Sequence, residues 1–296
     1  MKWLSLFPAA ALVVVANAAM ANCGSIPFVP GAEVYRPYQR AVTAFDGREQ
    51  ILQLSSDLRA DRPTKVLEVL PFPSRPEVTP GDDELFQKAT QHIEDGLAWR
   101  RRAQRGAAGG RAADLPAVAD NVVHERTEVH ETAVVRIADP RQFIVWVKDY
   151  LRRSGVDDPV IPTRVKFLVR DYVRDGFTWF VFHVLELGPE TVARPSMQYR
   201  FATRRLYYPL RIMGAESGEA TIRLALLSPR LVQMPDLRPV RAVLLHQPVA
   251  IDRDDLGYLD DGLVEFFGQQ GRQQLRLWEI KGPLGAMRRD VVTDWF

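Results

Sequence analysis

The run from Phe177 to Leu187 constrains the fold most, because almost every residue in it is apolar, aromatic or β-branched. A strand buried on both faces has this continuous apolar pattern, whereas a strand with one wet face alternates apolar and polar residues. Such a strand must lie inside a sheet and be covered by other elements on both sides. His183 lies between Val181 and Leu185 in this run, and we expect a core histidine with one hydrogen-bond partner.

Other helices and strands surround this run without a regular strand–helix–strand repeat. Asp46-Gly47 separates two apolar runs and predicts a hairpin, because both turn residues tolerate a positive φ. Asp139-Pro140 predicts the start of a helix that stops before Gly155. The other expected helices are about 82–102, 162–175 and 254–268, and the expected strands are 41–45, 48–55, 64–70, 129–138, 177–187, 197–208, 219–228, 240–251 and 272–281. This order predicts an α+β fold with mainly antiparallel sheets and about four helices.

An Ala/Gly-rich stretch at 103–121 is the best internal boundary of the chain, because it has few bulky apolar groups. It separates an N-terminal β-rich lobe with one helix, residues 22–102, from a C-terminal α+β lobe, residues 122–296. The sequence leaves open whether the two lobes are separate domains.

The first 21 residues have the three parts of a secretory signal peptide. Lys2 is the only charge before Glu33, an apolar stretch follows it, and Ala19-Met20-Ala21 places small residues at the cleavage site. We predict cleavage after Ala21, with cleavage after Ala18 as the alternative. The apolar stretch is shorter than the roughly 20 residues that span a bilayer. We therefore expect an exported, periplasmic or extracellular protein without a transmembrane helix after cleavage.

The chain has a single cysteine, Cys23, which excludes an intramolecular disulfide. Its position just after the predicted cleavage site allows a free thiol, an intermolecular disulfide or lipidation. Asn22 fits poorly before a lipidated cysteine, so we expect a thiol and keep the lipid anchor as the minor alternative. The formal net charge of +2 argues against nucleic acid as a partner.

The segment from His124 to Glu131 contains two histidines and three glutamates, which suggests a metal site. His124 and His130, however, are six residues apart. On a strand they would lie roughly 20 Å from one another, and on a helix they would point in different directions. We therefore expect no metal and no cofactor, and we keep His130 and Glu131 as weak candidates for ligand binding.

Three further segments resemble functional motifs but lack residues that those motifs require. In Gly214-Ala-Glu-Ser-Gly218 the serine is one place late for a nucleophile elbow, so a turn is expected. The acidic run that starts at Asp252 lacks two calcium-loop ligands, so it predicts a helix start. A terminal phenylalanine such as Phe296 is a feature of outer-membrane barrel strands, but the residues before it lack the alternating apolar pattern of such a strand.

Arginine and tyrosine recur at a spacing of four residues in the expected strand 197–208. Arg200, Arg204 and Tyr208 would share one face of that strand. Arginine with aromatic neighbours can bind phosphate, sulfate or acidic sugars by forked hydrogen bonds and stacking. These three residues are therefore the other weak candidates for ligand binding.

Four segments resemble a family of exported bacterial and archaeal proteins known only as a domain of unknown function. The segments are Cys23-Gly24, Arg62-Pro-Thr-Lys-Val-Leu-Glu-Val-Leu-Pro-Phe-Pro73, the stretch from Val129-His-Glu-Thr-Ala-Val-Val135 to Phe177-Thr-Trp-Phe-Val-Phe182, and Tyr199-Arg-Phe-Ala-Thr203 leading into Tyr207-Tyr-Pro-Leu210. The resemblance implies an exported location and a shared fold. It implies no activity, catalytic residue or cofactor.

The absence of a nucleophile, metal or phosphate-loop motif favours a non-enzymatic protein that binds an unknown ligand or protein of the cell envelope. A hydrolase with a scattered active site is the first alternative, because catalytic groups need only meet in space. In that case His130 or His183 should lie near a carboxylate, serine or threonine. A structural or assembly protein of the envelope is the second alternative, and a large exposed apolar patch would indicate it.

The signal-peptide prediction is testable by native mass spectrometry of the protein purified from its own host. We expect a mature chain that begins at Asn22 and has no lipid, because the small residues at Ala19 and Ala21 direct cleavage to that bond. A chain that retains Lys2, or one that begins with a lipidated Cys23, would contradict the prediction.

Overall fold

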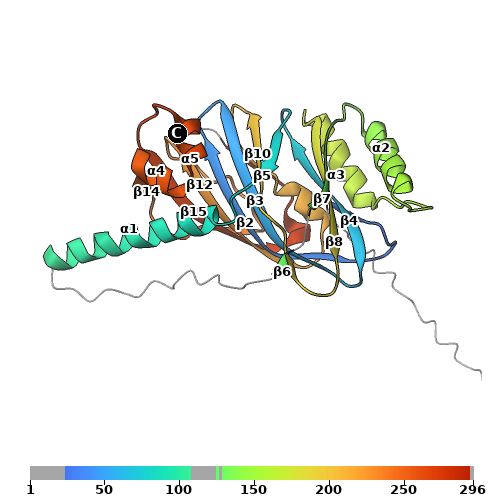
Figure 1. Ribbon diagram of the computed structural model, residues 1–296, viewed down its shortest axis with the longest axis horizontal. Coiled ribbons are helices and arrows are strands. Elements are labelled where there is room, and N and C mark those ends of the chain that lie inside the picture. The colour runs from blue at the N-terminus through green and yellow to red at the C-terminus, as the bar shows by residue number, and fades with distance from the viewer. Residues whose placement is uncertain (1–23, 108–124, 127–128, 294–296) are drawn as a thin grey trace, which may run out of the picture.

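The protein has an α+β fold with mainly antiparallel sheets, as the sequence predicts. The computed structural model describes residues 24–107, 125–126 and 129–293. Figure 1 shows four layers across the long axis: two helices, a four-stranded sheet, a larger sheet and a second group of helices. The predicted signal peptide lies outside the described residues.

The four-stranded sheet has the order β1-β4-β8-β7. Its strands are β1 (Ser25–Pro27), β4 (Thr64–Phe72), β8 (Trp179–Leu187) and β7 (Val129–Arg136). The apolar run forms β8, which lies between β4 and β7 and is almost wholly buried. β4 continues through Pro71, where the sequence predicts its end. Proline is tolerated there because β1 pairs with β4 only at Val66, Leu67 and Glu68.

The larger sheet has the order β13-β15-β12-β2-β3-β10-β5. Its strands are β13 (Arg241–Leu244), β15 (Gln273–Pro283), β12 (Glu219–Ser228), β2 (Val34–Phe45), β3 (Glu49–Ala60), β10 (Met197–Ala202) and β5 (Glu77–Pro80). β2 and β3 form the predicted hairpin, in which Gly47 has φ 98°. β12 pairs in parallel with β2, and β14 (Val249–Ile251) also pairs with β15.

Both sheets combine strands from the two sides of the predicted 103–121 connector. β4 precedes the connector and pairs with β8, which follows it. In the larger sheet, the β2–β3 hairpin lies between β12 and β10, which both follow the connector. The backbone hydrogen bonds of the sheets therefore run across the two lobes.

The helices cover the outer faces of the two sheets. They are α1 (Leu85–Ala107), α2 (Pro140–Arg153), α3 (Thr163–Arg174), α4 (Arg253–Leu259) and α5 (Asp261–Phe267). α2 and α3 lie against the four-stranded sheet, whereas α1, α4 and α5 lie at the opposite side of the molecule (Figure 1). Residues of β12 alternate accordingly: Leu224 packs toward the four-stranded sheet, and Ala225 packs with α1, α4 and α5.

Three expected elements are each divided in two. The helix expected at 254–268 breaks at Asp260, which has an extended backbone and caps α5 by accepting a hydrogen bond from the Leu263 N–H. The strand expected at 197–208 breaks after β10, because Thr203 bonds back to Arg205 in a local turn. The strand expected at 240–251 forms β13 and β14. The remaining short elements are β6 (Glu125–Arg126), β9 (Val192–Ala193), β11 (Leu206–Tyr208), β16 (Val291–Thr293) and the 3₁₀ turns η1 (Arg211–Ala215) and η2 (Leu284–Ala286).

α2 begins and packs as its sequence predicts. Asp139 accepts a hydrogen bond from the Arg141 N–H, Gln142 completes a capping box, and Pro140 occupies the first helical position. Phe143 is fully buried, and its ring lies 6.1 Å from the ring of Phe182. The buried side of α2 is thus attached to the central strand β8.

We expect replacement of Phe143 by alanine to lower the free energy of unfolding by about 3–5 kcal/mol, because it leaves a cavity between α2 and β8. Val145 on the same helix is 63 % exposed. Its replacement by alanine should change stability by less than about 0.5 kcal/mol. Urea denaturation of the two variants measures both values, and equal effects would contradict this packing.

Candidate functional site

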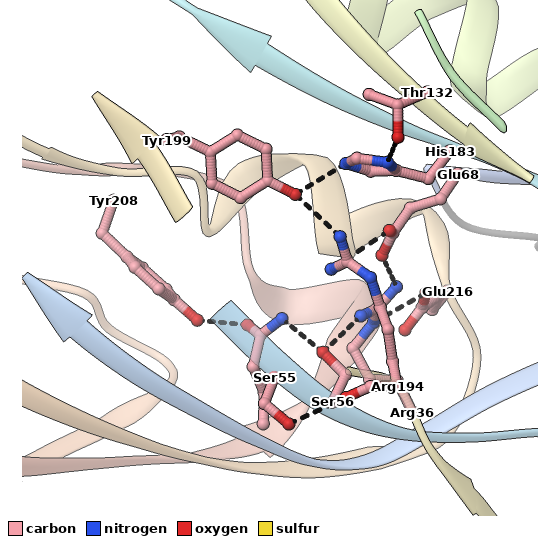
Figure 2. A network of polar contacts seen from close by, with 11 residues as sticks. Arg36, Ser55, Ser56, Glu68, Thr132, His183, Arg194, Tyr199, Tyr208 and Glu216 are labelled. Carbon is pink, nitrogen blue, oxygen red and sulfur yellow. Dashed lines mark hydrogen bonds and ion pairs between the residues drawn. The ribbon is translucent and has the colours of Figure 1, made fainter. Parts of the chain in front are cut away.

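A row of polar side chains crosses the inner face of the four-stranded sheet. Glu68 of β4 and Thr132 of β7 both lie directly opposite His183 of β8. Glu68 and His183 are buried within apolar strands, while Thr132 is exposed. Figure 2 shows this row meeting side chains of the larger sheet. Buried polar groups must be paired to be tolerated, so the contacts of this row define its chemistry.

Arg36 of β2 connects the row to the larger sheet. Its Nη2 donates to Glu68 Oε1 at 2.7 Å, its Nη1 donates to Ser56 Oγ at 2.7 Å, and its Nε lies 3.3 Å from Glu216 Oε1. The planar fork of arginine can meet three partners in this way without moving. Ser56 Oγ also accepts a hydrogen bond from Gln39 Nε2 at 2.8 Å.

Arg194 is the second cation of the network and is almost fully buried. It follows β9, and its backbone is joined to β3 through Ser56 O and the Ser55 hydroxyl. Its Nη1 lies 3.3 Å from Glu68 Oε2, and its Nη2 donates to the Tyr199 hydroxyl at 2.7 Å. Glu68 is therefore held between two guanidinium groups (Figure 2).

The hydroxyl of Tyr199 continues the chain of contacts to His183. Its oxygen accepts from Arg194 and lies 2.7 Å from His183 Nε2. If the tyrosine donates its single proton to Nε2, then Nδ1 has the ring proton and donates to Thr132 Oγ1, 2.9 Å away. This tautomer satisfies every contact of the three groups, and we adopt it on that ground.

The network has strongly shifted proton affinities. Burial alone would raise the pKa of Glu68, but the charges of Arg194 and Arg36 outweigh it and lower that pKa to about 2. Burial, together with the charge of Arg194, lowers the pKa of His183 to about 3. Burial raises the pKa of Glu216 well above its usual range, although Arg36 lies 3.3 Å away. Near neutral pH, His183 is therefore uncharged and Glu68 is ionised.

The described cavity beside Arg36 and Glu68 is too small for a substrate. A cavity of about 10 Å³ is lined by Arg36, Gln39 and Glu68 among others. That volume is close to the ~10–15 Å³ that one water molecule requires, whereas ligand pockets are about 300–1,000 Å³. The network can therefore join the two sheets by charge and hydrogen bonds, and this cavity has room for about one water molecule.

A larger pocket lies at the surface, in the corner between β7 and α2. We call it the β7–α2 pocket. Its volume is about 490 Å³. It is lined by Val135, Arg136, Ile137, Arg141, Gln142, Val145, Trp146, Asp149 and Arg153. Apolar side chains from both elements are thus surrounded by three arginines and one aspartate.

Two of the arginines in the β7–α2 pocket have no partner among the described residues. Arg136 and Arg141 are exposed and make no hydrogen bond or ion pair there. Arg153 Nε donates to the backbone oxygen of Asp149 at 3.3 Å, and Asp149 also lies 3.7 Å from Arg152. The lining is therefore net positive, with guanidinium groups available to an anion.

The structure separates the three arginine and tyrosine candidates of strand 197–208. Arg200 is half-exposed in β10 and pairs with Glu49 at 2.8 Å. Arg204 is exposed in the turn that follows β10. Tyr208 is buried in β11, where its hydroxyl donates to Gln39 Oε1 at the edge of the buried network. The shared strand face expected for these residues does not exist, because the chain turns at Thr203.

The other sequence candidates have mixed outcomes. Glu131 is exposed and accepts a hydrogen bond from the Tyr150 hydroxyl at 2.5 Å. The backbone of His130 belongs to β7, but its side chain lies outside the described part of the structure, as do His124, Ala21 and Cys23. His183 is the expected core histidine, with two hydrogen-bond partners rather than one.

The rejected motifs have ordinary structural roles. Asp252 caps α4 and forms a capping box with Asp255, as an acidic helix start predicts. Gly214 lies in η1, close to the backbone of Met287. Within the described ranges, no group of three or more histidine, cysteine or carboxylate side chains could coordinate a metal. In the same ranges, no helix is both long and apolar enough to cross a membrane.

Sequence reasoning missed most of the buried network. Glu68 gave a usable signal, since it shares a strand face with Val66 and Leu70, and an acidic residue there requires a buried partner. The sequence contains no comparable signal for Arg194 and Glu216, because each lies in a short irregular segment. The β7–α2 pocket was also missed, since it depends on how α2 lies beside β7.

The low pKa of His183 makes a prediction about acid stability. In the unfolded chain the pKa of His183 is near 6.5. Below that pH, His183 therefore binds a proton in the unfolded state but not in the folded state. Stability should therefore fall as the pH falls from 6.5 toward 3. Between roughly pH 7 and pH 4, the wild type should lose about 3 kcal/mol more than His183→Gln, which cannot titrate.

Urea denaturation of both proteins across this pH range measures the difference. The other carboxylates titrate in both proteins and cancel in the comparison. Parallel stability curves for wild type and variant would contradict a neutral, buried His183.

Comparison with known proteins identifies the family of the chain. A family model described as "Uncharacterized protein conserved in bacteria (DUF2330)" matches residues 17–258. A crystal structure of baculovirus P35 is similar at 8% sequence identity, covering 89% of this chain and 97% of that chain, with a TM-score of 0.41. A TM-score this low supports no conclusion about fold or function. No curated protein matches the chain. The match over most of its length shows that the chain belongs to this family of uncharacterized proteins conserved in bacteria.

Proposed function

We propose that this protein is an exported, non-enzymatic binding protein of the cell envelope, and that the β7–α2 pocket binds an anionic ligand or partner. The observation that supports binding is the pocket itself, about 490 Å³ in volume and lined by apolar side chains and three arginines. Pockets that bind small ligands are typically about 300–1,000 Å³ and combine apolar walls with a few charged or polar groups.

The unpaired charge in the pocket supports an anion. Arg136 and Arg141 have no carboxylate partner among the described residues, and the single acidic side chain in the lining is Asp149. Guanidinium groups bind carboxylate, sulfate and phosphate through paired hydrogen bonds. Val145 and Trp146 lie beside them and would contact an apolar part of the same ligand.

Export is supported by the N-terminal sequence alone. Lys2, the apolar stretch and Ala19-Met20-Ala21 form the pattern of a cleaved signal. The periplasmic or extracellular location in this proposal therefore depends on this N-terminal pattern.

Two observations among the described residues favour the hydrolase alternative: Thr132 contacts His183, and Glu68 lies opposite His183 on the neighbouring strand. A hydroxyl beside an imidazole can become a nucleophile when the imidazole accepts its proton. In the tautomer that we adopt, Nδ1 has the ring proton and donates to Thr132, so it cannot accept one. In addition, a pKa of about 3 makes His183 a weak base, and its side chain is 0 % exposed. Binding is therefore the better supported function.

The proposal predicts that the pocket distinguishes ligands by charge when their apolar tails are identical. We expect octanoate to bind more tightly than 1-octanol, and octyltrimethylammonium to bind most weakly. The double variant Arg136→Glu/Arg141→Glu should lower the affinity for octanoate by at least about ten-fold, because two attractive contacts become repulsive. Ligand-detected NMR below the aggregation concentration of each probe measures these affinities.

Arg241→Glu is the matched control, since Arg241 is an exposed arginine in the edge strand β13 of the other sheet. This variant should bind octanoate as the wild type does. Equal affinity for the three probes, or unchanged octanoate binding by the double variant, would rule out the proposed anion site.

A further inference from the structure

We propose that the occupant of the β7–α2 pocket is an extended acidic peptide segment that adds to β7 as a fifth strand of the four-stranded sheet. This inference rests on the proposed binding function and specifies the partner. It depends on the open edge of β7, on the position of α2 beside the end of β7 and on the charges along α2.

β7 is the last strand in the order β1-β4-β8-β7. Its pairing partner is β8, and no described strand pairs with its other edge. Along that edge, alternate residues direct their backbone N–H and C=O groups away from the sheet. Such groups can pair with another extended chain, and main-chain hydrogen bonds then provide much of the binding energy.

The half of β7 next to the pocket lacks the usual protection of an edge strand. Proteins protect edges with proline, lysine or a bulge. The bulge of β7 lies at its far end, between Val129 and Glu131, and the pairing is regular from Glu131 to Arg136. The residues Ala133-Val134-Val135 contain no proline and no charge, and they are half-buried.

α2 lies on the outer face of the sheet, and one of its sides lines a pocket together with the end of β7. Tyr150 contacts Glu131 near one end of β7, and the Trp146 ring lies 4.2 Å from that of Phe182, which is the partner of Ala133. The helix therefore runs alongside the strand in the opposite direction. One stripe of α2, formed by Arg141, Val145, Asp149 and Arg153, lines the pocket.

The spacing of this stripe matches a strand. Residues four apart on a helix are separated by about 6 Å along its axis. Alternate residues of a strand, which point to the same side, are separated by about 6.6 Å. A peptide of about seven residues could therefore present four side chains to the four positions of the stripe. The first and last would meet Arg141 and Arg153, which favours acidic residues at both ends.

Of the two middle positions of the stripe, Val145 favours an apolar residue, and Asp149 disfavours an acidic one. Val145 is 63 % exposed, and Trp146 is half-buried beside it, so both offer apolar surface to a bound chain. Arg136, at the end of β7, adds a second guanidinium group near Arg141 in the pocket lining. The partner is thus an extended segment with apolar residues flanked by acidic ones.

A synthetic peptide tests this inference directly. The probe is the capped, fluorescein-labelled heptapeptide Glu-Thr-Val-Thr-Val-Thr-Glu, which reads the same in both directions and so fits parallel or antiparallel pairing. Two controls have the same side chains, but one is N-methylated at the odd residues and the other at the even residues. In a strand, only one of these two sets of N–H groups can point toward β7.

We expect the parent peptide to bind with a measurable change in fluorescence polarisation. One methylated peptide should bind at least about ten-fold more weakly, and the other should bind like the parent. Arg141→Glu should weaken the binding of the parent peptide, while Arg241→Glu should leave that binding unchanged.

Two results would overturn the inference. In the first, both methylated peptides bind like the parent, and Arg141→Glu still weakens their binding. The pocket then binds acidic chains without strand pairing, and only the proposed function stands. If the parent fails to bind at millimolar concentration while octanoate binds, the pocket accepts small anions and not a strand. Failure of both probes would overturn the proposed function as well.

Discussion

The position of Glu68 between Arg36 and Arg194 is the interaction on which the packing of the two sheets depends. Glu68 belongs to the four-stranded sheet, Arg36 belongs to the larger sheet, and Arg194 is joined to β3 by its backbone. A buried ion pair adds little net stability, because desolvation offsets the attraction, but losing one partner leaves an uncompensated charge. The network therefore makes alternative alignments of the sheets unfavourable. A shift of β4 by one residue would turn Glu68 toward the outer face, where Phe180 and Phe182 pack with α2.

The buried network and the β7–α2 pocket have different properties. The polar groups of the network are buried apart from Thr132, its adjoining cavity has room for about one water molecule, and its histidine is held neutral. The β7–α2 pocket has the opposite properties, with exposed guanidinium groups beside apolar side chains. Strand β7 belongs to both regions, because Thr132 faces the network and Val135 lines the pocket. A rigid interior thus positions the edge at which a partner could bind.

The parts of the fold that were predictable from sequence are those that depend on local chemistry. The apolar run of β8, the Asp46-Gly47 turn and the Asp139-Pro140 cap each depend on the residues involved and their neighbours. The breaks at Thr203 and Asp260 were missed, because a side chain that bonds back to its own backbone interrupts an otherwise continuous pattern. Arg194 and the β7–α2 pocket could not be predicted, since their partners come from segments far away in the sequence. Glu68 was predictable in principle as a buried acid, but its partners were not.

The parallel pairing of β2 with β12 has a consequence for how the chain folds. The β2–β3 hairpin is made early during synthesis, yet the strands that flank it, β10 and β12, come much later in the chain. Closing such long loops slows folding, because chain entropy is lost before the contacts form. β4 lacks its partner β8 until Leu187 has been made, the β3 edge of the hairpin is open until Ala202, and the β2 edge is open until residues near Ser228 are available. The nascent protein is therefore exposed to aggregation for most of its synthesis, and a binding factor that shields strand edges would increase its yield.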